Sequence, residues 1–532
     1  MLTSMLTSKF FREHMHRLCA KVTIAAAGLA AAGCLTASAG AAQLHNWRLP
    51  YYTIAAEMEL VSSSPSGMFW DDLGIVPLKP AMPLKPAVPA SKVYDSAMLP
   101  DSMAFGRNHW TVEPAYSVAV ETPAPSKGRP FYWQLEVLND IRYRSLTARQ
   151  TLHADRLYDY DPLYPGHRER FARGRVEEAY LQYDWKYGFL RFGRLVRNWG
   201  PFIDRSLVLS SNPFSYDALE WQVHSSLFEF RHLFAAFVPN EHFNDSADNR
   251  PGRFLAAHAL SVMFKKWVTI GITEAMVFRR PQGFPDFQYV NPFSIYSVTN
   301  TNQEGKGNLV LGFQWNVHPG LENLSLRGQL LLDDFQVDRK LTTDREPPHW
   351  GLDAGLYWRD ALPLPMRNLL KAGYQRRSKW VYTVMDNDMA WGEGYTYLSK
   401  GLGAPKNDGD SVWAGFSVIG KNHWAGSAVV SYAREGENGD TSRWHDSDPG
   451  NAVGLPYDYT SKQFPSGTVE STITLSLEAM AYFKDYADLR IGFANRWIKN
   501  KNHMLHQGFT YSPVFSAQIG IHFSDFFIRL PE

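Results

Sequence analysis

From about residue 130 onward, apolar and polar side chains alternate along one segment after another. Residues 309–317 place Leu, Leu, Phe, Trp and Val at every second position, and polar or small residues stand between them. The same period of two returns in residues 324–332, 412–418, 473–479 and 515–523. In an extended chain this alternation puts the apolar side chains on one face and the polar ones on the other. The pattern therefore predicts a chain built from β-strands.

We count roughly 16 to 18 such segments, most of them about 9–12 residues long, which is the length that a tilted strand needs to cross a bilayer. Short turns alternate with long polar stretches, of which residues 387–410 and 433–470 are examples. Such asymmetry is typical of outer-membrane barrels, and only a closed sheet pairs every strand backbone group in lipid. The sequence predicts an all-β fold, a transmembrane antiparallel β-barrel of about 16–18 strands, over residues 130–532. A soluble propeller or stacked sandwich is the alternative, although no blade-length repeat is visible.

The first 42 residues have the pattern of a signal peptide. An apolar, alanine-rich stretch at 22–35 is followed by the small residues Ala37-Ser38-Ala39, and we expect cleavage near residues 39–42. The positive region before that stretch consists of Lys9, Arg12, Arg17 and Lys21. The alternatives are a membrane anchor, for which the apolar stretch is short, and a lipoprotein acylated at Cys34. Removal of residues 1–42 would leave a mature chain without cysteine, because Cys19 and Cys34 both leave with it.

Residues 43–129 differ in composition from the strand-rich remainder of the chain. They contain two near copies of a Pro-Leu-Lys-Pro-Ala-x-Pro phrase, at 77–83 and 83–89. Proline lacks the backbone N–H that a sheet interior requires, and such a stretch favours a polyproline conformation. We expect a Pro-rich N-terminal segment, periplasmic or lumenal, with a disordered linker as the alternative.

The amino-acid composition argues against several classes of function and favours a membrane barrel. The chain has 54 basic and 53 acidic residues, so nothing suggests a nucleic-acid partner. Aromatic residues make up 14%, which suits a barrel with aromatic girdles at both membrane interfaces. Motifs for a serine hydrolase, a zinc protease or a phosphate loop are missing. We therefore expect no enzyme, no cofactor and no metal, with an outer-membrane lipase or protease as a remaining alternative.

Three segments carry candidate binding residues. Residues 192–213 set three arginines around a Trp-Gly-Pro turn, a second segment leads from a glutamate to an Asn-Pro, and a third ends an apolar strand in two aspartates. Charged side chains facing lipid are costly, so we expect this set in the lumen or in loops, with the acids as lumenal partners of the arginines. The candidate set comprises Arg194, Arg197, Trp199, Arg205, Glu274, Asn291, Asp333 and Asp334.

The same residues allow two interpretations. In the first, the charges form a network that closes and stiffens the barrel interior. In the second, they bind an acidic or neutral glycan, since guanidinium groups match carboxylates and planar polar groups. Loop aromatics, including Trp391, Tyr395 and Tyr397, could likewise stack on sugar rings or only pack within the loops.

Taken in order, the three segments resemble the Wzi-like capsule-assembly family of outer-membrane proteins, over residues 130 to 525. The resemblance implies a barrel of about 18 strands in a Gram-negative outer membrane, surface polysaccharide binding, and a part in attaching capsule or exopolysaccharide to the cell. It does not identify sugar-contacting residues. We expect a monomer in contact with outer-membrane lipid, with capsular or exopolysaccharide as partner. The alternative is a porin-like channel for small polar or anionic solutes.

Overall fold

The computed structural model describes the barrel and parts of its loops. The described residues are 57–58, 108–122, 130–159, 161, 163–166, 173–203, 205–237, 252–264, 267–280, 285–302, 307–321, 323–334, 349–384, 394–420, 424–437, 463–483, 487–506, 508–523 and 526–529. The expected signal peptide and the proline-rich repeats lie outside them. Within them, no helix is both long and apolar enough to cross a membrane.

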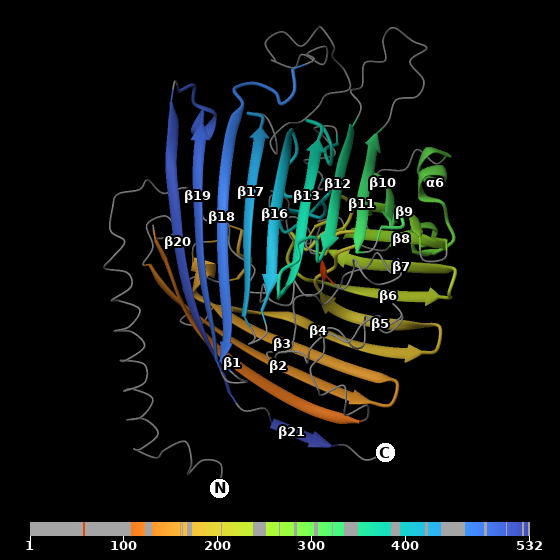
Figure 1. Ribbon diagram of the computed structural model, residues 1–532. Coiled ribbons are helices and arrows are strands. Elements are labelled where there is room, and N and C mark those ends of the chain that lie inside the picture. Colours follow the sequence, from red (N-terminus) through yellow and green to blue (C-terminus); the bar gives the residue numbers. More distant parts are fainter. Residues whose placement is uncertain are drawn as a thin grey trace.

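Antiparallel strands form the wall of the molecule (Figure 1). The first half contains β1 His109–Thr122, β2 Phe131–Tyr143, β3 Leu146–Asp155, β4 Gly174–Trp185, β5 Gly188–Leu195, β6 Tyr216–His224, β7 Phe228–Phe237, β8 Gly252–Phe264 and β9 Val268–Arg280. The second half contains β10 Gly307–Val317, β11 Leu324–Asp334, β12 His349–Arg359, β13 Arg367–Arg377, β16 Gly409–Ile419, β17 Trp424–Glu435, β18 Glu470–Phe483, β19 Ala487–Lys499, β20 Phe509–His522 and β21 Phe526–Arg529. The remaining short elements are η3 Arg156–Asp159, α5 Phe287–Val290, α6 Tyr296–Asn302, the hairpin β14 Thr396–Tyr397 with β15 Lys400–Gly401, and η5 Lys501–His503.

Strand β1 closes the barrel, because it pairs with β2 on one edge and with both β20 and β21 on the other. Since β21 continues the line of β20, the described strands give a wall of 18 positions, which confirms the predicted antiparallel barrel. The expected start of the barrel at residue 130 was wrong, since β1 precedes it. Pro114 fits in β1 because β20 pairs with residues 115–122 and β21 with 109–112, so the proline stands at the gap between them.

The alternation of apolar and polar side chains predicted from the sequence is observed in the strands of the barrel wall. In β10, Leu311, Phe313 and Trp315 point outward, while Gln314 and Asn316 are buried inside. In β11, Ser325, Arg327 and Gln329 are likewise buried inside. Apolar side chains therefore cover the outer face of these strands, where a transmembrane barrel meets lipid.

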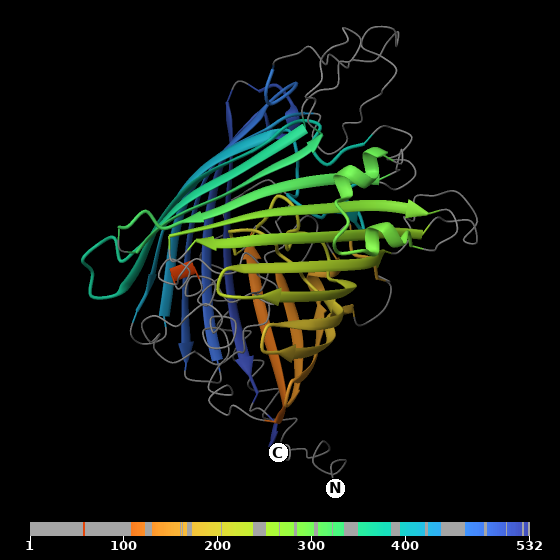
Figure 2. The same ribbon diagram turned by 90° about the vertical axis from the view of Figure 1, so that its right-hand side faces the viewer.

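Short turns lie at one end of the barrel and long connections at the other (Figures 1 and 2). In outer-membrane barrels the short turns face the periplasm. Helices α5 and α6 belong to the long connection between β9 and β10, and they lie on the outside of the wall (Figure 2).

Of the N-terminal segment before β1, Glu57 and Met58 are described, and both lie inside the barrel. The carboxylate of Glu57 is 2.7 Å from Lys371 Nζ on β13. Met58 is buried against Phe202, Tyr357 and Leu369. At these two residues the segment is lumenal.

Candidate functional site

The connection between β5 and β6, residues 196–215, folds into the lumen and carries the Trp-Gly-Pro turn. Trp199 pairs with Leu209 through a backbone hydrogen bond of 2.7 Å, and Asn198 donates to the carbonyls of Phe202 and Ile203 at 2.7 and 3.0 Å. Gln329, from β11, accepts from the Leu207 N–H at 2.6 Å. The loop is therefore folded by its own side chains and fixed to the inner wall.

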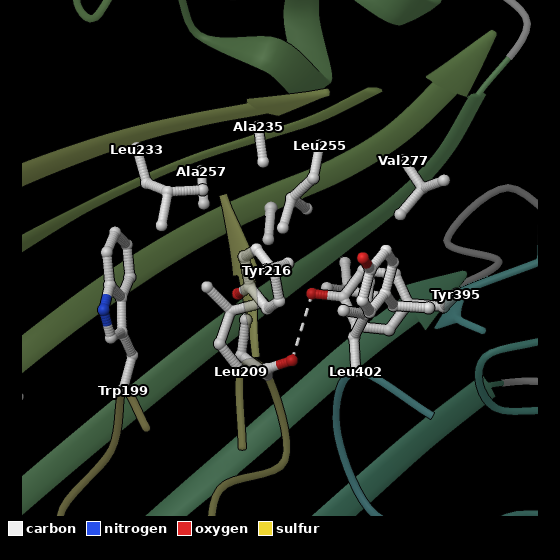
Figure 3. Close-up of a cluster of buried hydrophobic side chains, with 14 of the residues drawn as sticks. Trp199, Leu209, Tyr216, Leu233, Ala235, Leu255, Ala257, Val277, Tyr395 and Leu402 are labelled. Carbon is white, nitrogen blue, oxygen red and sulfur yellow. Dashed lines mark hydrogen bonds between the residues drawn. The ribbon is translucent and has the colours of Figure 1, made fainter. Parts of the chain in front are cut away.

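A second connection, residues 378–408 between β13 and β16, packs on the first (Figure 3). The Tyr382 hydroxyl donates to Leu207 O at 2.6 Å, and the Tyr395 hydroxyl donates to Val208 O at 3.0 Å. Burial raises the pKa of both phenols, so they stay neutral donors. Apolar inward side chains of β7 to β9, including Leu233 and Leu255, cover this pair of loops. Together they fill part of the lumen from one wall.

One glutamate holds three arginines inside the wall. The carboxylate of Glu220, on β6, is 3.2 Å from Arg197 Nε, 3.2 Å from Arg231 Nη1 and 3.7 Å from Arg191 Nε. All four side chains are buried. Arg197 also donates to the carbonyls of Leu195 and Tyr216. Because Arg197 is enclosed in this way, its role in the structure is the stiffening network of the first interpretation.

Arg205 lies in a different setting, which we call the Arg205 cluster: Phe202, Arg205, Asp353, Tyr357 and Trp413. Its guanidinium lies over the rings of Phe202 and Trp413, 4.2 and 4.9 Å from their centroids. Its Nε donates to Asp353 at 2.7 Å. Yet 24% of the Arg205 side chain remains exposed, and Trp413 is only partly buried. The cluster thus offers an aromatic ring and a cation to the lumen, while Asp353, 1% exposed, holds the guanidinium from behind.

Hydroxyl groups line the wall next to this cluster. Ser431 and Thr474 are cross-strand partners on β17 and β18, and both are half-buried. Arg490 donates to Glu478 at 2.5 Å further along the same wall. The inward hydroxyl residues of β17 to β20 are Ser427, Ser431, Thr472, Thr474, Ser476, Thr510, Ser512 and Ser516. Hydroxyls that donate and accept, beside charged groups, suit a polar, hydroxyl-rich ligand.

Two of the predicted residues lie on the outside of the wall, which corrects the expectation of a lumenal or loop position. Arg194 shares the outward face of β5 with Leu190 and Phe192, and its Nη2 is 2.5 Å from Asp217 on β6. Glu274 shares the outward face of β9 with Ile270 and Ile272. Strand parity decides both positions, because residues two apart point to the same side.

The remaining predicted site residues also lie apart from one another. Asn291 ends α5 on the outside, where its side chain accepts from the Phe293 N–H at 3.1 Å. Asp333 accepts from the backbone N–H of Tyr382 and so holds the second lumenal loop. Asp334 is the last residue of β11, next to an irregularity in its pairing with β12. The candidate set is therefore not one site, and Arg205 is the member that lies in the partly open cluster described above.

Among the loop aromatics, Tyr395 and Tyr397 are buried in the lumenal core, which supports the packing interpretation for them. Trp391 lies outside the described residues. The residues that sequence reasoning missed are Glu220, Asp353 and Trp413. Alternation could have placed Trp413 inside, because Val412 and Ala414 point outward on either side of it.

In the described part of the chain, no three histidine, cysteine, aspartate or glutamate side chains are grouped so that they could hold a metal ion. The polar groups of the Arg205 cluster and of the hydroxyl wall are suited to hydrogen bonding and ring stacking with an uncharged or anionic ligand.

No family model matches this sequence, and no curated protein is significantly similar to it. Among solved structures, the chain is similar to Wzi of Escherichia coli, described as an outer membrane protein involved in group 1 capsule assembly and a carbohydrate-binding β-barrel. The identity is 13%, the match covers 93% of this chain and 100% of Wzi, and the TM-score is 0.55.

Two Pseudomonas aeruginosa outer membrane proteins are more distant. OpdO matches with 10% identity, 80% and 98% coverage of the two chains and a TM-score of 0.44. OpdK matches with 8% identity, 79% and 100% coverage and a TM-score of 0.43. These scores are too low to carry an argument. The likeness to Wzi confirms the resemblance seen in the sequence at the level of the fold, which is that of a Gram-negative outer-membrane barrel.

Proposed function

We propose that this protein resides in the outer membrane after signal-peptide cleavage, binds surface polysaccharide in its lumen, and helps to assemble or attach capsule or exopolysaccharide at the cell surface. The observation that carries the proposal is the Arg205 cluster, in which a partly open arginine and tryptophan lie beside a wall of hydroxyls. The description of Wzi as a carbohydrate-binding barrel agrees with this proposal, since the two chains share a fold.

The chemistry of the cluster fits a sugar ligand. The partly exposed ring of Trp413 suits the C–H side of a pyranose, and Arg205, held by the buried Asp353, offers N–H donors for hydroxyl groups. A carboxylate on an acidic sugar would find its partner in Arg205, whose charge is shared with Asp353. The buried Tyr357 hydroxyl accepts from Arg205 Nη2 at 3.4 Å and helps to hold the guanidinium in place.

Binding of the purified protein to polysaccharide from its own host tests the proposal. We expect Trp413→Ala to weaken binding about tenfold or more, as loss of a central aromatic anchor does. Trp424→Ala is the matched control, because Trp424 lies on the outward face of β17 and should leave affinity unchanged. Equal affinities for the Trp413 variant and the parent protein, measured by calorimetry, would remove the lumenal site.

The cellular part of the proposal has its own test. Deletion of the gene should release polysaccharide into the medium while total synthesis stays the same, because the protein acts in attachment. Cell-bound and free polysaccharide are measured after gentle centrifugation, and a plasmid copy serves as the control. Unchanged cell-bound polysaccharide in the deletion strain would contradict a role in attachment.

A channel for small polar or anionic solutes is the second candidate. The half-buried hydroxyls of β17 to β20 favour it, since such a wall could also line a water-filled path. Single-channel recording separates the two functions. A steady conductance that host polysaccharide does not block supports the channel, whereas little current together with polysaccharide binding supports the attachment protein.

A further inference from the structure

The outer face of the barrel carries charge where lipid is expected. Glu274 on β9 is directly paired with His258 on β8, and His258 is paired in turn with His232 on β7. All three share the outward parity of their strands, and His258 Nε2 lies 3.0 Å from the Glu274 carboxylate. Ionisable groups facing hydrocarbon are costly and need cover. Glu274 and His232 are nevertheless buried, so something on the outside shields them.

The shield is the segment of residues 285–302, which we call the outer pad. Glu274 accepts from the backbone N–H groups of Tyr296 and Ser297 at 2.9 and 3.3 Å, and from the Ser297 hydroxyl at 2.7 Å. The ring of Tyr296 lies 4.4 Å from that of His258. Every oxygen of the carboxylate therefore has a partner that excludes solvent and lipid.

The pad also packs on the apolar part of the wall. Phe293 stacks on Phe230 of β7, with ring centroids 6.0 Å apart and an interplanar angle of 10°. Tyr289 lies 4.8 Å from the ring of Phe278 on β9. The inner side of the pad therefore packs against strands β7 and β9 and is not exposed to solvent.

The opposite side of the pad is apolar and uncovered. Residues 287–302 contain no charged side chain. The large apolar side chains of the pad that stay exposed are Phe287 at 68%, Ile295 at 59% and Val298 at 53%, together with Phe293, which is 79% exposed although it stacks on Phe230. Polar side chains of the pad bond to one another, as Ser294 and Thr299 do at 3.0 Å. A surface of this kind in water would be an exposed apolar patch that marks an interaction site.

We propose that the outer pad is embedded in the outer leaflet of the membrane and that its partner is lipid acyl chains. Its apolar side continues the lipid-facing band of the strands beneath it, in which Ile270 and Ile272 are 51% and 40% exposed. The charged pair Arg280 and Asp286 stands at its border, next to the long-loop end of β9. The pad widens the barrel locally and carries the Glu274–His258 pair inside the bilayer without contact with lipid. This inference does not depend on the proposed function.

Spin labels at single cysteines test the proposal. Cys19 and Cys34 are replaced by alanine in the full chain, so that a cysteine introduced by Phe293→Cys or Val298→Cys is the only one. The labelled proteins are reconstituted in phosphatidylcholine vesicles, and collision rates with oxygen and with a water-soluble nickel chelate are compared. Ile270→Cys on the outward face of β9 is the lipid standard, and His506→Cys in an exposed loop is the water standard.

We expect both pad labels to collide preferentially with oxygen, as the label at position 270 does. Preference for the nickel chelate, as at position 506, would overturn the proposal, since the pad would then lie in water. Low collision with both reagents, together with spin–spin broadening between identical labels, would also overturn it, because a second copy of the chain would then cover the pad. The two labelled positions check each other, since Val298 is 53% exposed and Phe293, although it stacks on Phe230, is 79% exposed.

Discussion

At the scale of single residues, the most demanding arrangement is the carboxylate of Glu220 among Arg191, Arg197 and Arg231. Three guanidinium groups share this acid, and all four side chains are buried. Removing one partner of a buried ion pair costs more than the pair itself contributes, because an uncompensated charge stays behind. Glu220 therefore determines whether these arginines are tolerated inside the wall.

We expect Glu220→Gln to lower the free energy of unfolding by about 3 kcal/mol or more, since glutamine keeps the shape and loses the charge. Unfolding by urea in detergent micelles, followed by tryptophan fluorescence, measures this. Glu435→Gln is the matched control, because it removes the partner of the exposed Lys406 and should cost less than about 1 kcal/mol. If both variants lost equal stability, the central role assigned to Glu220 would be incorrect.

Single residues also show which side-chain positions can be predicted from the sequence and which cannot. The period of two that puts Ile270 and Ile272 outward also puts Glu274 on the outward face, so the pattern alone indicates its position. We expected Glu274 in the lumen only because a charge that faces lipid is costly. That expectation failed because the cover for Glu274 comes from α6, whose contact with β9 no local pattern reveals. The pair Arg205 and Asp353 stands 148 residues apart, and only the closed barrel brings its members together.

At the scale of elements, alternation predicted the strands well where one face meets lipid and the other a polar lumen, as in β10 and β11. It is weaker in β7 to β9, because their inward side chains, such as Leu233, Ala257 and Ala275, are apolar too. These strands face the two inserted loops and not water. Strand β1 was missed for another reason, since residues 43–129 were set apart as one segment by composition and β1 lies within them.

The second lumenal loop gives an element-scale prediction. Arg377 and Gly409, on either side of it, are direct cross-strand partners, so residues 379–407 can be replaced by a short Gly-Ser turn without moving β13 or β16. This change removes Tyr382 and Tyr395 from the lumen, and we expect a clearly larger conductance in planar bilayers than for the parent protein. Far-UV circular dichroism checks that the barrel persists. Identical conductance in a folded variant would mean that this loop does not narrow the lumen.

At the scale of the whole molecule, closure depends on an even number of strands. Strand β1 runs antiparallel to both β2 and β20, so these two run parallel to each other. A chain that lacks β1 would have to join β2 to β20 in parallel, whereas the described strands of the wall pair antiparallel throughout, and a parallel pair is slightly less stable per residue. An open sheet in detergent exposes unpaired edges and does not hold the compact form.

Gel migration of unheated and boiled protein tests this closure. We expect the parent protein, and a variant that lacks residues 75–90, to migrate faster before boiling, because a closed barrel resists detergent. Deletion of residues 109–122 should abolish the difference, since it removes β1 and with it both seams of the wall. Because the two deletions fall on either side of residue 108, their gel migration shows on which side of this residue the barrel begins. A compact, heat-modifiable product of the second deletion would show that the barrel closes without β1, and the pairing of β1 with β20 and β21 would then be dispensable for the fold.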